Sequence, residues 1–225
     1  SFTSHAGETT AIIGSTGSGK SSLLNLILRF YDVTGGRILV DGVDVREYSQ
    51  QELRGKIGYV PQRAVLFSGS IAGNLRLGRE DASDSELSRA VSIAQADEFV
   101  NRREGGLEAG LSQGGANLSG GQKQRLSIAR AVARRPEIYL FDDSFSALDF
   151  TTDAKLRAAL SGETKDATVL IVAQRVSTIR HADRILVLDG GEQAGLGTHR
   201  ELLKSCPVYR EIAESQLSQK EMDYE

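Results

Sequence analysis

Eight residues near the start of the chain have the types and spacing of a phosphate-binding loop. An apolar run, Thr9–Ile13, precedes them and a helical pattern, Ser21–Arg29, follows, which disfavours the alternative of a glycine-rich turn with an exposed lysine. Backbone N–H groups of such a loop turn toward phosphate oxygens, and the positive end of the next helix assists them. We expect Lys20 to reach the phosphates and Ser21 to hold Mg²⁺. The residues assigned to nucleotide binding are Gly14, Ser15, Thr16, Gly17, Ser18, Gly19, Lys20, Ser21 and Ser22.

A carboxylate with suitable chemistry follows the apolar run Ile138–Phe141. Open α/β sheets bind ligands at the carboxyl ends of their parallel strands, so Asp142 is expected beside the phosphate loop. We expect Asp142 to contact Mg²⁺ through a water molecule. A purely structural aspartate at a strand end is the alternative.

A third motif lies between the other two and precedes a helical pattern, Gln122–Arg134. It reads Leu118-Ser119-Gly120-Gly121-Gln122 and continues with Lys123-Gln124-Arg125. The three motifs in this order make the chain resemble the nucleotide-binding domains of the ABC transporter family, over essentially its whole length. The resemblance implies that Ser119, Gly120, Gly121 and Gln122 contact ATP held by a second such domain, with help from the helix dipole. A simple turn before a helix is the alternative for these five residues alone.

Two further positions take their expected roles from the same resemblance. Gln62 stands where the family has a glutamine that touches Mg²⁺ and reports to the membrane domain; a solvated loop amide is the alternative. Asp149 belongs to a segment resembling the loop that crosses the dimer interface, although it could serve only as a helix N-cap. The segment Val65–Ile71 looks like the exporter form, and its apolar residues would either seat a coupling helix or belong to the core.

Two catalytic positions depart from the family pattern. Asp143 stands where most members carry a glutamate that polarises the attacking water, and its carboxylate falls about 1 Å short, an error that can cost ~10²-fold in rate. Gln174 stands where a histidine is usual; it can donate an N–H bond but carries no charge. Both departures predict a site that binds nucleotide and hydrolyses it slowly. A small backbone shift that lets Asp143 still act as the base is the alternative.

The elements that must position these residues alternate between strands and helices. Short apolar runs of the buried parallel type recur at Lys56–Val60, Val169–Ala173 and Ile185–Leu188, which indicates an α/β fold. We expect a P-loop NTPase (RecA-like) core with a parallel sheet over residues 1–74 and 134–225, interrupted by a helical subdomain over 75–133 that carries the signature. Within the insert, one helical pattern runs from about Asp84 to Arg103.

Composition narrows the functional classes. The net charge of −3 gives no indication of a nucleic-acid surface, and the single Cys206 excludes an intramolecular disulfide. No apolar run approaches the roughly 20 residues that cross a bilayer, so we expect any membrane connection to come from a partner or from sequence outside this chain. The three histidines, His5, His181 and His199, show no metal-binding spacing and are expected at the surface.

Together these observations predict an ATP-binding, Mg²⁺-dependent ATPase domain of an exporter, at the cytoplasmic face of the cell membrane. The expected partners are transmembrane domains and a second, non-identical nucleotide-binding domain, whose competent site this chain's signature would complete. Alternatives are an ATP-dependent clamp without useful hydrolysis, a non-transport ABC ATPase acting on DNA or ribosomes, or a nucleotide kinase. The kinase would not need the signature, and the coiled-coil insert of a DNA-repair type is absent.

Overall fold

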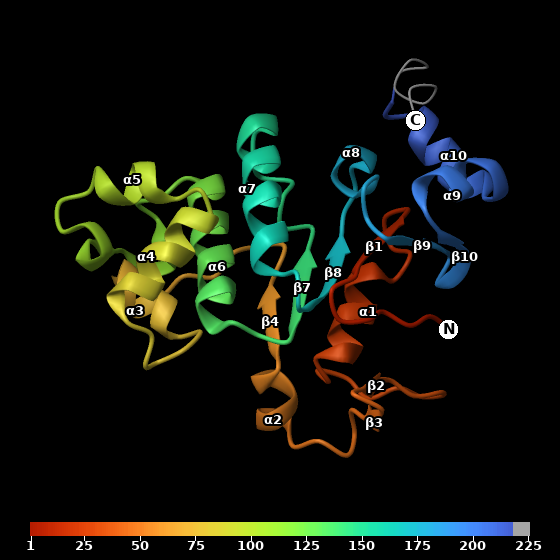
Figure 1. Cartoon of the computed structure of the whole chain (residues 1–225), viewed down its shortest axis with the longest axis horizontal. Helices are drawn as coiled ribbons and strands as arrows, with labels where there is room; N and C mark the ends of the chain where they lie inside the picture. The colour runs from red at the N-terminus through yellow and green to blue at the C-terminus, as the bar shows by residue number, and fades with distance from the viewer. Residues whose placement is uncertain (218–225) are drawn as a thin grey trace.

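The protein is described from a computed structural model, which covers residues 1–217. A six-stranded sheet runs through the molecule (Figure 1). Its strands in spatial order are β10 (Glu192–Gly197), β9 (Arg184–Asp189), β1 (Thr9–Gly14), β8 (Thr168–Val172), β7 (Ile138–Asp142) and β4 (Ile57–Val60). All neighbours pair in parallel except β10, which pairs antiparallel with β9 at one edge. The predicted α/β class with a parallel sheet is confirmed.

Ten α-helices occur within the described residues, together with two short antiparallel strand pairs. The helices are α1 (Lys20–Ile27), α2 (Gln50–Gly55), α3 (Ile71–Arg76), α4 (Asp84–Ile93), α5 (Asp97–Asn101), α6 (Gly120–Arg134), α7 (Phe150–Glu163), α8 (Val176–Ile179), α9 (His199–Ser205) and α10 (Pro207–Glu214). The strand pairs are β2 (Leu39–Val40) with β3 (Val43–Asp44), and β5 (Gly69–Ser70) with β6 (Gly110–Leu111). Two 3₁₀ turns, Gly106–Glu108 and Gln113–Gly115, lie in the glycine-rich stretch before α6.

The central strand β1 is buried on both faces because successive side chains point to opposite sides of a sheet. Ile12 packs in one cluster with Leu24 of α1, whereas Ala11 and Ile13 pack in another with Tyr209 of α10. Helices therefore cover both faces of the sheet, as parallel sheets require. This arrangement buries the strands and leaves their carboxyl ends to carry polar groups.

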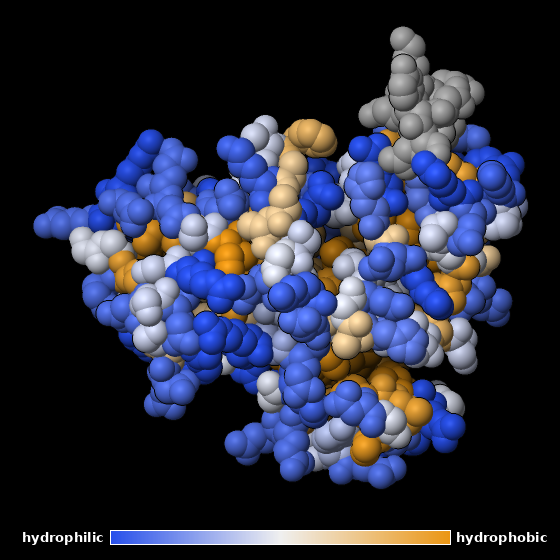
Figure 2. All heavy atoms as spheres, viewed as in Figure 1, coloured by the Kyte–Doolittle hydropathy of each residue, from blue (hydrophilic) through white to orange (hydrophobic). Residues whose placement is uncertain are grey.

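Helices α3–α6 gather beside β4 at one end of the sheet (Figure 1). They share one apolar cluster with Tyr139 and Phe141 of β7. The helix α3 begins at Ile71, four residues before the boundary expected at residue 75, and the division into core and subdomain stays a prediction. Figure 2 shows that hydrophilic residues cover most of the viewed face, with hydrophobic residues reaching the surface over β2 and β3, where Leu39 and Val43 are exposed.

Two helix predictions need correction. The single helix expected from Asp84 to Arg103 is two helices, because Gln95 adopts a left-handed backbone with φ of 55° and ends α4. The signature helix begins at Gly120 rather than at Gln122, because Ser119 caps it. Glycine lowers helix propensity, but a capping box recovers the cost at the first turn.

Within residues 1–217, none of the helices combines the length and the apolar character that a membrane span needs.

Candidate functional site

The phosphate loop joins β1 to α1, and its glycines are required by two different constraints. A Cβ on Gly14 would lie 2.1 Å from the carbonyl oxygen of Leu188 on β9, so only glycine allows the strands to approach this closely. Gly17 and Gly19 have φ of 83° and 93°, in the left-handed region that glycine adopts at low cost. The loop thus turns sharply between the end of a buried strand and the N-terminus of a helix, the arrangement that binds phosphate.

Lys20 lies across this loop. Its Nζ donates to the carbonyl oxygens of Gly14 (2.8 Å) and Ser15 (2.7 Å). Partial burial lowers the pKa of Lys20, and the charges of Asp143 and Asp142 oppose that shift. The ammonium is therefore held between the loop and two carboxylates, where it can pair with phosphate oxygens.

Ser21 and Asp142 come together as predicted, although 121 residues separate them in sequence. The Ser21 hydroxyl donates to Oδ1 of Asp142 at 3.0 Å, and the Tyr59 hydroxyl donates to Oδ2 at 3.5 Å. A hydroxyl beside a carboxylate is a donor set of hard oxygen ligands, which suits Mg²⁺. Ser21, Asp142 and the amide of Gln62 therefore fit the metal that accompanies ATP in such sites.

Asp143 directly follows β7 and receives two side-chain amides. Gln62 donates from Nε2 to Oδ2 of Asp143 at 3.2 Å, and Gln174 donates to the same oxygen at 2.8 Å. Asp143 has φ of 48°, which is uncommon for a residue with a side chain, and its N–H donates to the carbonyl oxygen of Val172. The ends of β4, β7 and β8 thus converge on one carboxylate.

Burial sets the electrostatics of both carboxyl groups. Desolvation raises the pKa of Asp142, against the hydrogen bonds from Ser21 and Tyr59 and the charge of Lys20. Desolvation also raises the pKa of Asp143, and the neighbouring charge of Asp142 adds to the rise. The pKa of Tyr59 is raised to about 12 by its burial and by the charge of Asp142, so its hydroxyl stays a donor. Two adjacent buried acids favour a cationic ligand between them.

We call the following residues the phosphate-loop cluster: Lys20, Ser21, Tyr59, Gln62, Asp142, Asp143 and Gln174. Hydrogen bonds form two sets, one around Asp142 and one around the adjacent Asp143, and Lys20 is coupled to both carboxylates through its charge. Sequence reasoning missed Tyr59. The only available signal was its place near the end of a predicted strand, beside Gln62, because an aromatic residue in a strand ordinarily indicates packing.

The signature residues form their own local structure. Ser119 Oγ accepts from the Gln122 N–H at 3.3 Å, and Gln122 Oε1 accepts from the Ser119 N–H at 3.0 Å, which is a complete capping box. Ser119 and Gly120 are exposed, and their hydrogen bonds among residues 1–217 do not reach the phosphate-loop cluster. The structure therefore does not bring the signature to this chain's own phosphate loop.

Asp149 is the N-cap of α7, because its Oδ1 accepts from the Thr152 N–H at 3.0 Å. The segment that it ends lies against the signature helix: a Cβ on Gly121 would lie 3.2 Å from the carbonyl oxygen of Ala147. Phe150 follows with 73% of its surface exposed. The signature and this segment thus form one exposed surface, and the interface role of Asp149 stays a prediction.

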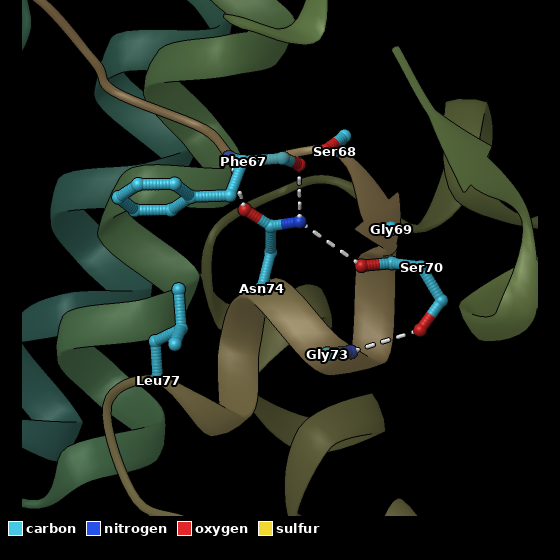
Figure 3. A pocket seen from close by; sticks show the side chains of 7 residues that line it. All are labelled: Phe67, Ser68, Gly69, Ser70, Gly73, Asn74 and Leu77. Atoms are coloured by element: carbon cyan, nitrogen blue, oxygen red, sulfur yellow. Dashed lines mark hydrogen bonds between the residues drawn. The ribbon is translucent and has the colours of Figure 1, made fainter. Parts of the chain in front are cut away.

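The exporter-like segment is divided between core and surface. Leu66 and Ile71 are buried, whereas Val65 and Phe67 are 55% and 56% exposed. A pocket of about 270 Å³ lies here, lined by residues 67–70, Gly73, Asn74 and Leu77 (Figure 3). Leu77 also lines a second pocket of about 250 Å³ that includes Phe30 and Tyr59. The core alternative holds for half of the apolar residues; the other two are exposed, and Phe67 lines the first pocket, which we call the groove.

Asn74 organises this groove, and sequence reasoning did not identify it. Its Oδ1 accepts from the Phe67 N–H at 2.8 Å and its Nδ2 donates to the carbonyl oxygens of Phe67 and Ser70 (Figure 3). Arg130 of the signature helix donates to the carbonyl oxygen of Asn74 at 2.9 Å and to that of Val65 at 3.0 Å. The groove is therefore tied directly to α6.

One histidine prediction is wrong. His5 and His181 are exposed, but His199 is only 3% exposed and its Nδ1 lies 2.7 Å from the Tyr209 hydroxyl. The helix α9 begins at His199 because Thr198 and Glu201 form a capping box there, and the His199–Tyr209 contact joins α9 to α10. A lone histidine in sequence gives no sign of such a helix–helix contact.

Comparisons with known proteins agree on one family. The profile described as "ABC transporter" matches residues 1–146. A Mycobacterium tuberculosis protein named only as an uncharacterized ABC transporter ATP-binding protein is 54% identical over 219 residues, which are 96% of this chain and 37% of that protein. A Staphylococcus aureus protein with the provisional name multidrug export ATP-binding/permease protein is 45% identical over 92% of this chain and 36% of its own length.

A solved structure of a bacterial Atm1-family ABC exporter with ATP bound is also similar. It superposes with a TM-score of 0.93 at 39% identity, over 97% of this chain and 38% of that one. The chain thus spans between 36% and 38% of the length of these three relatives. The predicted P-loop NTPase fold is confirmed.

Proposed function

This chain belongs to the ABC transporter family, and on that premise we propose that it is the ATP-binding and ATP-hydrolysing domain of an exporter. The observation that carries the proposal is the convergence of Ser21, Gln62 and Gln174 on two adjacent carboxylates beside the phosphate loop. The kinase alternative is disfavoured because it leaves the signature without a role. The likeness to an ATP-bound exporter over 97% of the chain supports this class of function.

ATP binding follows from the loop's chemistry. The backbone of residues 14–19 would bind phosphate oxygens, and Lys20 would exchange its contacts to Gly14 and Ser15 for contacts to phosphate. Ser21, Asp142 and Gln62 would hold Mg²⁺, which when bound neutralises phosphate charge. Phosphate oxygens carry negative charge, which the Gly14 and Ser15 carbonyls do not, so the exchange adds an ion pair to the lysine's hydrogen bonds and is favourable.

We propose that this site hydrolyses ATP slowly. Asp143 would orient the attacking water through Oδ1, but its short side chain is held by two amides on Oδ2 and cannot advance. Gln174 contacts the carboxylate as a neutral group and supplies no positive charge to the developing negative charge on the phosphate. Charge and reach are thus both reduced at the positions that act on the reacting atoms.

The exposed signature supports a partner domain. Ser119, Gly120 and Gly121 stand at the N-terminus of a 15-residue helix, and within residues 1–217 Ser119 bonds to its own helix rather than to this chain's phosphate loop. They would contact ATP on a second domain, with Asp149 and its segment at the same interface. A dimer of identical chains would hold two slow sites, so we propose a non-identical partner with a competent catalytic pair.

The groove lined by Phe67 and Leu77 is the proposed contact with transmembrane domains. Exposed apolar residues around a concavity commonly mark a docking site. Because Arg130 joins the groove to the signature helix, movement of a docked segment would reach the nucleotide interface. With this contact, we propose that the chain works at the cytoplasmic face of the cell membrane.

The test measures ATP hydrolysis and nucleotide binding before and after the combined change Asp143→Glu and Gln174→His. We expect the wild type to bind Mg-ATP and turn over slowly, and the double variant to turn over faster by about 10²-fold. Lys20→Ala in the double variant is the control that assigns the turnover to this loop. Brisk hydrolysis by the wild type would make Asp143 a working base and remove the main support for a non-identical partner. Binding without turnover in either form favours the ATP-dependent clamp.

A further inference from the structure

Gln216, just after α10, bonds to the backbone on both sides of Arg175. Its Nε2 donates to the carbonyl oxygen of Gln174 at 2.8 Å, and its Oε1 accepts from the N–H of Val176 at 2.8 Å. One amide thus uses a donor and an acceptor on the segment that carries the side chain at position 174. The two contacts cross 42 and 40 residues of sequence.

The segment has a local need for such a contact. The helix α8 begins at Val176, and its N-cap, Arg175, makes no side-chain capping hydrogen bond. The first N–H groups of a helix have no partner inside the helix. Gln216 supplies the missing acceptor from 40 residues further along the chain. Its Nε2 also holds the carbonyl oxygen of Gln174, two positions before Val176.

Neighbouring contacts of α10 hold Gln216 in place. Tyr209 and Ala213 of α10 are fully buried. The N–H groups of Gln216 and Leu217 donate to the carbonyl oxygen of Ala213 at 3.0 and 2.8 Å. These buried α10 residues share one apolar cluster with Val176 of α8, and Leu217 packs against that cluster. The two hydrogen bonds of Gln216 therefore couple the position of α10 to the backbone of Gln174.

We propose that Gln216 is a positioning residue of the ATP site. It fixes the Gln174 backbone while Asp143 fixes the Gln174 side chain through the 2.8 Å contact to Oδ2. With both ends held, Gln174 faces the terminal phosphate of ATP with little freedom to lose on binding. The inference rests on the proposed function, since it requires ATP at the phosphate loop, and it makes the C-terminal helices part of that site.

A purely structural role makes a different prediction. If Gln216 only fastens α10 to the domain, its loss lowers stability and affects ATP and ADP equally. If Gln216 positions Gln174, removing its side-chain amide weakens ATP binding, because only ATP carries the terminal phosphate, and leaves ADP binding unchanged. The ratio of the two affinities therefore separates the two roles.

The experiment measures Mg-ATP and Mg-ADP affinities of the full chain for wild type, Gln216→Leu and Gln216→Glu. We expect Gln216→Leu to weaken ATP about fivefold, the factor that one hydrogen bond of ordinary net strength represents, with ADP unchanged. Gln216→Glu keeps the acceptor for Val176 and loses the donor to Gln174, so it should show the same selective loss. Gln193→Leu, at an exposed glutamine on β10, is the matched control and should change neither affinity.

A double-mutant cycle then tests the route. In a Gln174→Ala background, Gln216→Leu should have no further effect on the ATP-to-ADP ratio, because the side chain that it positions is gone. Equal losses for both nucleotides, no loss for either, or an additive effect in that background would overturn the inference while leaving ATP binding intact. Failure of the wild type to bind either nucleotide would overturn the proposed function, and this inference with it.

Discussion

The phosphate-loop cluster collects its side chains from α1 and the ends of β4, β7 and β8, whereas the signature side draws its contacts from one helix start. In the cluster, Asp142 and Asp143 each receive two side-chain donors from distant parts of the chain. At the signature, the side chains of Ser119 and Gln122 bond to each other's backbone N–H groups. The first region is complete within one chain, and the second presents an ordered surface that the proposed partner would use.

This contrast has an energetic side. The cluster holds two buried carboxyl groups with raised pKa values, and Asp143 has a backbone in the left-handed region. Such features lower stability and are typical of functional sites. The signature costs little, because a capping box satisfies its backbone groups. Loss of the Lys20 ammonium in the cluster should therefore affect mainly nucleotide binding, whereas loss of the Ser119 cap at the signature should affect mainly stability.

The largest effect is expected from Gly14→Ala, which should damage binding and stability together. The added Cβ would lie 2.1 Å from the Leu188 carbonyl oxygen and 2.7 Å from Ser18 Oγ, so β1 and β9 must separate. We expect a loss of about 3 kcal/mol or more in the free energy of unfolding, measured by denaturant titration, together with lost ATP binding. The control Gly35→Ala adds a Cβ with nothing within 4 Å and should be nearly neutral. A stable Gly14→Ala variant that binds ATP would contradict the close-packed loop.

Lys20→Ala should break binding without breaking the fold. Loss of a cationic donor to phosphate is expected to weaken ATP about 10²-fold, or about 2.7 kcal/mol, by isothermal titration calorimetry. The thermal midpoint should move little, because the lysine's two carbonyl partners both belong to the same loop and no other element depends on these hydrogen bonds. Lys155→Ala, at an exposed lysine on α7, is the matched control. Unchanged ATP affinity would exclude this loop as the binding site.

Ser119→Ala should lower stability without weakening ATP binding, the reverse of Lys20→Ala. It removes an N-cap, so we expect about 1 kcal/mol of lost stability and a thermal midpoint lower by about 2–4 °C. ATP affinity of the isolated chain should not change, since Ser119 lies outside the phosphate-loop cluster. Ser119→Asp keeps a capping oxygen and should restore the midpoint. A parallel fall in the chain's own ATP affinity would show that the two regions are not separate.

Asp143→Asn is expected to give the smallest change, a gain of stability at neutral pH. The folded-state pKa of Asp143 is raised above the unfolded value of about 3.9, so the ionised group destabilises the fold at pH values above that raised pKa. The penalty shrinks as pH falls through the folded pKa and disappears below the unfolded one. Thermal unfolding of both proteins from pH 7 to pH 4 should therefore show the variant's advantage fading with acid. A stability advantage of Asp143→Asn that grows as the pH falls would contradict the raised pKa of Asp143.

Sequence reasoning recovered the phosphate-loop cluster better than the groove or the contacts of Gln216. Lys20, Ser21 and Asp142 were predictable because strand-loop-helix spacing and the carboxyl ends of parallel strands place phosphate and metal groups in a standard way. Asn74 was not, because a buried asparagine that bonds the Phe67 backbone looks like any polar residue in a helical pattern. Gln216 was equally hidden, since its partners lie 42 and 40 residues away.

The sequence by itself determined the phosphate loop, the alternation of strands and helices, and the two departures at positions 143 and 174, because these depend on residue type and local spacing. Only the tertiary structure decided that both departures meet on one oxygen of Asp143, that Tyr59 joins Asp142, and that His199 is buried. The physical reason is that hydrogen bonds and burial act between atoms close in space. A sheet whose neighbouring strands are far apart in sequence brings such atoms together without leaving a local pattern.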